Sequence, residues 1–244
     1  KLAASGKNVL ITIEQLDNPL PREGRTAGLY HFALLLPSRK DLARFIRHIV
    51  KAGYPLQGAS DHLVSEALYL SDPDGNGIEI YRDRPSSEWG WNGEEVVMAT
   101  DPLDVEGILS EDDGVSWGCL PHGTIMGHIH LHVSELKQSK DFYCEGLGFD
   151  LVCSYGGQAL FLSTGGYHHH IGLNTWAGVG APAPKEHSVG MMFYTMTFPA
   201  DSERRAAIEK LASLGFLARE EGGSLYVNDP SGNKIELSIE SVED

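Results

Sequence analysis

Several features that mark particular classes of protein are scarce or missing in this sequence of 244 residues. No apolar run approaches the ~20 residues that a membrane-spanning helix needs, and the first residues lack a signal-peptide pattern. Cysteine occurs three times and never as CxxC, so neither a disulfide framework nor a zinc knuckle is implied. The 19 basic against 34 acidic residues give a net charge of −15, which argues against a nucleic-acid or anionic-membrane partner. These absences predict a cytoplasmic protein with reduced thiols and a small-molecule or protein partner.

One sequence motif occurs twice in the chain: LYLSDPDGNGIEIY begins at Leu68 and LYVNDPSGNKIELS begins at Leu225. Its centre is turn chemistry, because proline presets φ, glycine and asparagine accept positive φ, and aspartate bonds the backbone two residues on. Each copy therefore predicts a hairpin of two strands.

A longer repeat surrounds these hairpins. Stretches that begin at Leu29, Gly127 and Met191 each contain an apolar strand, a helical pattern and a terminating glycine followed by an aromatic residue. Short strand-like runs follow each helix. The sequence thus predicts an α+β fold of tandem βαβββ modules, with a first module that is incomplete at its start because the chain begins at Lys1. A stretch without periodicity, rich in Pro, Trp and acidic residues, predicts a linker at 96–122 between domains at 1–95 and 123–244.

The repeated hairpin also places a carboxylate. In GIEI and KIEL, the aliphatic neighbours of Glu79 and Glu236 point to one face of the strand and the glutamate points to the other. We expect the aliphatic side chains to pack under the helix of the module. The glutamates then lie on the opposite face, either simply solvated or paired with a cation.

Histidines favour the cation. In GHIHLHV (127–133) alternate residues are histidines that share a face, and in YHHHIGL (167–173) His168 and His170 share a face with His169 opposite. Imidazoles and a carboxylate on convergent strands form the ligand set of non-haem Fe(II), Mn(II) or Zn(II) sites. The competing interpretation is a patch of stacked histidines that binds an anion or water.

These motifs resemble the vicinal oxygen chelate superfamily, which includes glyoxalase I, bleomycin-resistance proteins and extradiol dioxygenases. GLYHFALLLPSRKDL, GASDHLVSEALYLSDPDGNGIEIYRDRP and GHIHLHV are similar to the two-domain catechol 2,3-dioxygenase branch, and the resemblance covers nearly the whole chain. It implies that the modules pair into curved mixed β-sheets with helices outside.

The resemblance also implies metal ligands. His128 matches the first histidine ligand and Glu236 the last, but Phe193 occupies the position of the second histidine ligand. Phenylalanine cannot bind a metal, so we expect His170 to supply the missing nitrogen, with His187 as a weaker candidate.

Two further residues match catalytic positions of extradiol enzymes. His169 is expected to move substrate and dioxygen protons, and Tyr226, ten residues before Glu236, is expected to contact the substrate. In the first domain, His31 and Glu79 keep ligand-type positions, yet the resemblance makes this domain a structural relic. His62 is interpreted as an ordinary strand histidine that bonds across the sheet.

The function that follows is extradiol cleavage of a catechol-type aromatic diol by O₂. Fe(II) is the expected metal, with Mn(II), Zn(II) and Ni(II) as alternatives. A glyoxalase-like metal-dependent isomerase or lyase is the rival enzyme. A metal-free binding protein, with Trp176, Tyr155 and Phe193 around an apolar pocket, is the third interpretation. Nucleic-acid and membrane partners are not expected, and exposed outer strands are compatible with a homo-oligomer.

Overall fold

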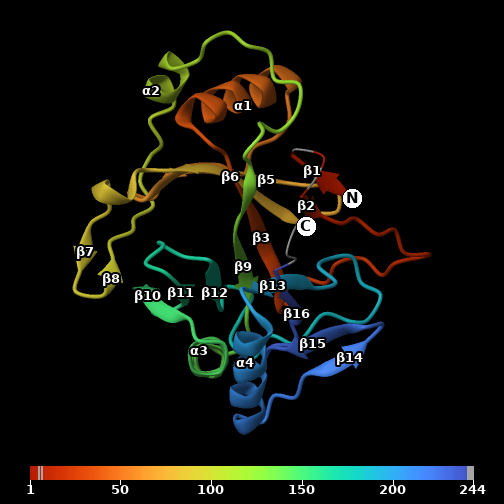
Figure 1. The fold of residues 1–244 in the computed structure, drawn as a ribbon. Coiled ribbons are helices and arrows are strands. Elements are labelled where there is room, and N and C mark those ends of the chain that lie inside the picture. Colours follow the sequence, from red (N-terminus) through yellow and green to blue (C-terminus); the bar gives the residue numbers. More distant parts are fainter. Residues whose placement is uncertain (5, 7, 241–244) are drawn as a thin grey trace. The chain divides into compact units, whose positions relative to one another are not determined.

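The computed structural model describes residues 1–4, 6 and 8–240 and divides the chain into two compact units. The first unit comprises Lys1–Asn18 and Tyr30–Ile129, and the second comprises Pro19–Leu29 and His130–Asp244 (Figure 1). Among the described residues, no helix is both long enough and apolar enough to span a bilayer.

The first unit is built around one predicted module, in the order strand, helix and three strands. Strand β3 pairs in parallel with β6, β6 pairs antiparallel with β5, and β5 pairs antiparallel with β4. The elements are β1 (Leu2–Ala3), β2 (Val9–Ile11), β3 (Gly28–Leu35) from Tyr30 on, α1 (Arg39–Ala52), β4 (Gly58–Asp61), β5 (Ser65–Ser71), β6 (Gly77–Asp83), a 3₁₀ turn (Ser86–Glu88), β7 (Trp91–Asn92), β8 (Glu95–Val96), α2 (Val105–Ser110) and the first part of β9 (Ile125–His132).

Helix α1 begins and ends where its sequence signals predict. The Ser38 hydroxyl accepts a hydrogen bond from the backbone N–H of Asp41, and Gly53 ends the helix in the left-handed conformation at φ 64°. The apolar stripe of the helix packs over aliphatic residues of β3, β5 and β6, among them Ile78 and Ile80. Glu79, between them, lies on the opposite face, as predicted.

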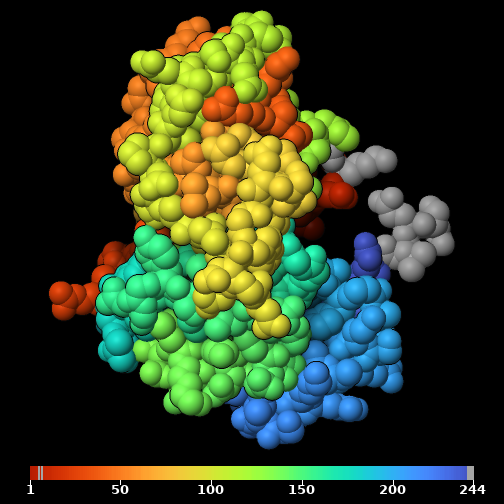
Figure 2. All heavy atoms as spheres, turned by 90° about the vertical axis from the view of Figure 1, so that its left-hand side faces the viewer, coloured from red at the N-terminus to blue at the C-terminus, as the bar shows by residue number. Residues whose placement is uncertain are grey.

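The predicted linker is partly structured. It contains α2 and an acidic run that binds the arginines of α1: Glu111 pairs with Arg39 at 2.6 Å, while Asp112 and Asp113 pair with Arg47 and Arg44. In Figures 1 and 2 this yellow-green segment covers the orange helix α1. Residues 96–122 therefore pack within the first unit.

The second unit contains the remaining two modules. Its last four strands have the order β13-β16-β15-β14, with β13 parallel to β16, which repeats the order β3-β6-β5-β4 of the first unit. This correspondence confirms the predicted repeat of βαβββ modules. The elements are α3 (Leu136–Lys140) with a following π-helical turn (Asp141–Gly146), β10 (Asp150–Tyr155), β11 (Ala159–Ser163), β12 (Ile171–Asn174), β13 (Tyr194–Phe198), α4 (Asp201–Ser213), β14 (Arg219–Glu221), β15 (Ser224–Asn228) and β16 (Lys234–Ile239).

The two DPxGN turns have the same internal hydrogen bonds. The Asp72 carboxylate accepts bonds from the backbone N–H groups of Asp74 and Asn76 and from the Asn76 amide, at 2.8–3.0 Å. Asp229 accepts the three equivalent bonds in the second copy. Each turn aligns the strand that carries the glutamate against the preceding strand.

Candidate metal centre

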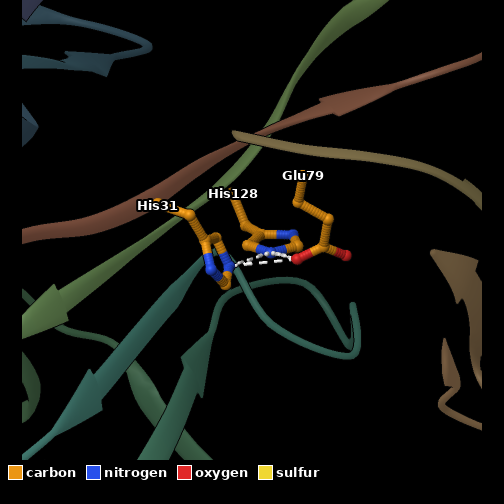
Figure 3. A group of neighbouring side chains, drawn as sticks. All are labelled: His31, Glu79 and His128. Carbon is orange, nitrogen blue, oxygen red and sulfur yellow. Dashed lines mark hydrogen bonds and ion pairs between the residues drawn. The ribbon is translucent and has the colours of Figure 1, made fainter. Parts of the chain in front are cut away.

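Three side chains from three different strands of the first unit meet at one point. The Nε2 atom of His31, on β3, lies 3.0 Å from Oε2 of Glu79, on β6. The Nε2 atom of His128, on β9, lies 3.1 Å from the same oxygen and 3.4 Å from Nε2 of His31. Figure 3 shows the two imidazole edges and the carboxylate directed at one another.

The strand register explains why these side chains meet. His31 is opposite Gly77, and Ala33 is opposite Glu79, in the parallel pair of β3 and β6. Because alternate residues share a face, His31, Ala33 and Glu79 all point away from the aliphatic layer under α1. Gly77 and Ala33, the cross-strand neighbours of His31 and Glu79, have little or no side chain. They therefore leave space in which the glutamate side chain reaches the imidazole.

The group is deeply buried, with exposed fractions of 6% for His31, 2% for Glu79 and 3% for His128. Burial by itself would raise the pKa of Glu79, but the charge of His128 and hydrogen bonds from both histidines outweigh burial and hold that pKa well below its usual value. An ionised carboxylate is costly to bury unless cations or strong donors surround it. The group therefore contains a buried, ionised carboxylate whose oxygen faces the Nε2 atoms of both histidines.

The donor set fits a divalent transition metal. One ligand atom from each of His31, Glu79 and His128 lies within 4.8 Å of the others. Two imidazoles and one carboxylate are the ligands that non-haem Fe(II) sites use, and they leave coordination positions open. Within the described part of the chain, no other group of three or more His, Cys, Asp or Glu side chains converges in this way.

A tyrosine and a histidine extend the site toward the outer strands. Tyr69 is directly opposite Glu79 on β5, and its hydroxyl lies 2.6 Å from Nε2 of His62. Nδ1 of His62 lies 2.7 Å from the Ala99 carbonyl oxygen, so this nitrogen carries a proton. Burial, followed by the charge of Glu79 and a hydrogen bond with it, raises the pKa of Tyr69 well above its usual value.

The hydrogen bonds of Tyr69 can be satisfied in two ways. With neutral His62, the Tyr69 hydroxyl donates to Nε2 of His62. With protonated His62, Nε2 donates to the tyrosine oxygen, and the hydroxyl proton is free to turn to Glu79. The pair can therefore take up one further proton, which sits on Nε2 of His62 while Tyr69 keeps its hydroxyl proton.

The predicted site residues of the second unit lie in other surroundings. His170 is half-buried, and its Nδ1 atom lies 3.2 Å from the Ser163 hydroxyl. Burial, followed by the charge of His168, lowers its pKa. Glu236 is half-exposed on β16 and accepts a hydrogen bond from Thr195 at 2.8 Å.

The predicted catalytic residues are also engaged in local contacts. Nδ1 of His169 lies 2.8 Å from Nδ1 of His168. The Tyr226 ring contacts Phe193 edge-on, and the ammonium of Lys234 lies 4.2 Å above the ring. Of the predicted ligands, the structure brings only His128 into the group with His31 and Glu79. The assignment of His170, Glu236, His169 and Tyr226 to a site stays a prediction.

Two signals in the sequence could have identified the first-unit group. His31 and Glu79 keep ligand-type positions, and Tyr69 precedes Glu79 by ten residues, as Tyr226 precedes Glu236. His62 lies directly after β4 rather than within a strand; it bonds across the sheet, as predicted, but its partner is Tyr69, the tyrosine next to the candidate site.

Comparisons with known proteins agree with this fold. The family model for the Glyoxalase/Bleomycin resistance protein/Dioxygenase superfamily matches residues 4–80 and 125–237. The chain is 48% identical over 246 aligned residues to catechol-2,3-dioxygenase of Bacillus subtilis (strain 168), covering 98% of this chain and 85% of that protein. It is 30% identical over 122 residues to biphenyl-2,3-diol 1,2-dioxygenase 3 of Rhodococcus globerulus, covering 48% of this chain and 63% of that protein.

Solved structures share the fold at low sequence identity. One, from Bacillus subtilis subsp. subtilis str. 168, has a TM-score of 0.59 and 14% identity, covering 90% of this chain and 66% of that chain. A glyoxalase I variant from Zea mays has a TM-score of 0.50 and 15% identity, covering 87% of this chain and 68% of that chain. With the family model, the close relative and the shared fold, the chain belongs to the Glyoxalase/Bleomycin resistance protein/Dioxygenase superfamily.

Proposed function

We propose that the protein is an extradiol dioxygenase that cleaves the ring of a catechol-type aromatic diol with O₂, and that His31, Glu79 and His128 hold its Fe(II). The observation that carries this proposal is the buried group of two imidazoles and one carboxylate. The name of the relative from Bacillus subtilis supports the substrate class and the oxidoreductase activity. The resemblance of the sequence motifs to the catechol 2,3-dioxygenase branch implies the same reaction.

The ligand residues have two tasks in this proposal. When bound, Fe(II) would lower the pKa of the diol hydroxyls and hold diol and O₂ next to each other. Glu79 supplies the negative charge that a divalent cation needs, and burial at 2% exposure keeps water from competing with it. His31 and His128 face that carboxylate through the same ring atom, Nε2, so both are oriented before a metal arrives.

Tyr69 and His62 are suited to proton handling next to these ligands. A diol that loses a hydroxyl proton needs a nearby acceptor, and later a donor for the ring-fission product. Neutral His62 can take a proton through the Tyr69 hydroxyl, since Nε2 is the unprotonated nitrogen. The Ala99 carbonyl holds His62 in that tautomer.

The ligand set predicted from sequence, His128 with His170 and Glu236, is the alternative for the same reaction. His169 and Tyr226 would then be its proton carrier and substrate contact. Metal analysis of two variants separates the sets. His31→Ala should lose bound iron and His170→Ala should keep it, if the first-unit group is the site.

The activity test uses iron-loaded protein, catechol and an oxygen electrode. We expect O₂ uptake together with a yellow ring-fission product. Product without O₂ uptake would favour the glyoxalase-like isomerase, and protein that binds no transition metal would favour the metal-free binding protein. We also propose a cytoplasmic location, which the three free cysteines support.

A further inference from the structure

We propose that Tyr81 is a positioning residue for the metal ligand His128, and that position 127 must be glycine for this reason. The proposal rests on the function proposed above, because it concerns the same ligand. Tyr81 is fully buried and follows Glu79 by two residues, so it lies on the same face of β6. It is the one large aromatic residue of that strand face.

The surroundings of Tyr81 are built from small residues. Ala33 and Ala67, both fully buried, form a cluster with Tyr81. Across the strands, Ala67 lies directly opposite Tyr81 on β5. The Tyr81 ring therefore packs against two alanine side chains, and this close packing sets its position.

On its other side, Tyr81 contacts the strand that carries His128. The centroids of the Tyr81 and His128 rings are 5.0 Å apart at an angle of 55°. A Cβ atom placed on Gly127 would lie 2.6 Å from Cζ and 2.7 Å from Cε1 of Tyr81, and closer still to the hydroxyl oxygen. Such distances are not compatible with an unmoved side chain, so any residue larger than glycine must displace either the ring or the strand.

Either displacement moves His128. A shift of the Tyr81 ring, which packs against Ala33 and Ala67, changes its contact with the His128 ring. A shift of the strand moves His128 directly, because it is the next residue after Gly127. The Nε2 atom of His128 has to stay within about 3 Å of the carboxylate oxygen of Glu79, where the structure has it at 3.1 Å. Loss of a residue that orients a ligand typically weakens metal affinity about 10- to 100-fold.

The test measures metal affinity in four single variants and one double variant by competition with a chromophoric chelator. Gly127→Ala should weaken Fe(II) or Co(II) binding about 10- to 100-fold. Gly118→Ala is the matched control, because a Cβ at exposed Gly118 meets no atom within 4 Å, and it should bind as wild type. Tyr81→Leu should weaken binding as well, whereas Tyr81→Phe, which keeps the ring, should remain near wild type.

The double variant Gly127→Ala, Tyr81→Leu removes the three tyrosine atoms nearest the new methyl group. It should bind metal more tightly than Gly127→Ala alone. Equal affinity in Gly127→Ala and wild type would overturn the proposal. So would equal losses in Tyr81→Phe and Tyr81→Leu, because the ring would then not matter.

A second measurement does not depend on metal or on the proper folding of a variant. In metal-free wild-type protein, a nuclear Overhauser effect should connect the ring protons of Tyr81 and His128, and its absence would refute the positioning contact. If wild-type protein binds no divalent metal while this effect is present, the proposed function fails and the contact stands.

Discussion

Replacement of Glu79 by glutamine tests whether the metal is bound by His31, Glu79 and His128. The alternative ligand set, predicted from sequence, contains Glu236 instead of Glu79. The substitution keeps the size of the side chain and removes the charge that both histidines face, at 3.0 and 3.1 Å. Residues that only orient a ligand cost about 10- to 100-fold in metal affinity, so loss of a direct ligand should cost more than about 100-fold. This corresponds to at least about 2.8 kcal/mol, since each tenfold change is about 1.4 kcal/mol.

The assay is a competition titration of metal-free protein with Fe(II), or with Co(II) in air. The matched control is Glu236→Gln, which makes the same chemical change at the corresponding position of the other hairpin. Glu236 is half-exposed and accepts a hydrogen bond from Thr195, so we expect its variant to bind metal as wild type does. The reasoning is refuted if Glu79→Gln keeps its metal and Glu236→Gln loses it.

Three further predictions concern other properties. Tyr69→Phe should leave metal affinity unchanged and lower kcat about 100-fold or more, as expected for loss of a proton carrier; an unchanged kcat would remove the residue from the reaction. Because the folded-state pKa of Glu79 is depressed, its contribution to stability is present above the usual value of 4.5 and is lost as the pH falls through the folded pKa. Urea unfolding of metal-free protein below pH 4.5 should therefore show a steeper loss in wild type than in Glu79→Gln, and parallel curves would contradict the shift. Glu66→Gln should lower the free energy of unfolding by about 3–5 kcal/mol, because Glu66 is fully buried and its replacement leaves the buried guanidinium of Arg82 without this carboxylate. Glu111, the half-exposed ion-pair partner of Arg39, is the control: Glu111→Gln should lower the free energy of unfolding by under about 1 kcal/mol. Similar losses of stability in Glu66→Gln and Glu111→Gln would show that burial does not cause the difference.

Local chemistry in the sequence was sufficient for the modules and their turns. Ser38 and Gly53 bound α1 because a hydroxyl that caps an N–H and a residue that tolerates positive φ act within a few positions of the chain. The alternation of side chains in GIEI placed Glu79 away from the aliphatic layer for the same reason. His31 and Glu79 were recognised as ligand-type residues by their place in the repeated phrase.

The partners of these ligands were not local. His128 is 49 residues from Glu79 and 97 residues from His31 in the chain, yet the three meet in one unit. The predicted set joined His128 to His170 and Glu236 because self-alignment pairs modules by sequence order. The same self-alignment cannot say that β9, which carries His128, lies next to β3 in space, since strand pairing between modules depends on long-range contacts.

By itself the sequence determined the repeated βαβββ module, its helix caps, its DPxGN turns and the face on which each glutamate lies, because all of these depend on backbone chemistry within a few residues. The tertiary structure alone decided that Glu79 meets His31 and His128 in a buried group, that Tyr69 links it to His62, and that Tyr81 packs against Gly127. Those contacts depend on which strands pair and at what register, and the free energy that fixes them is spread over the packing of a whole sheet.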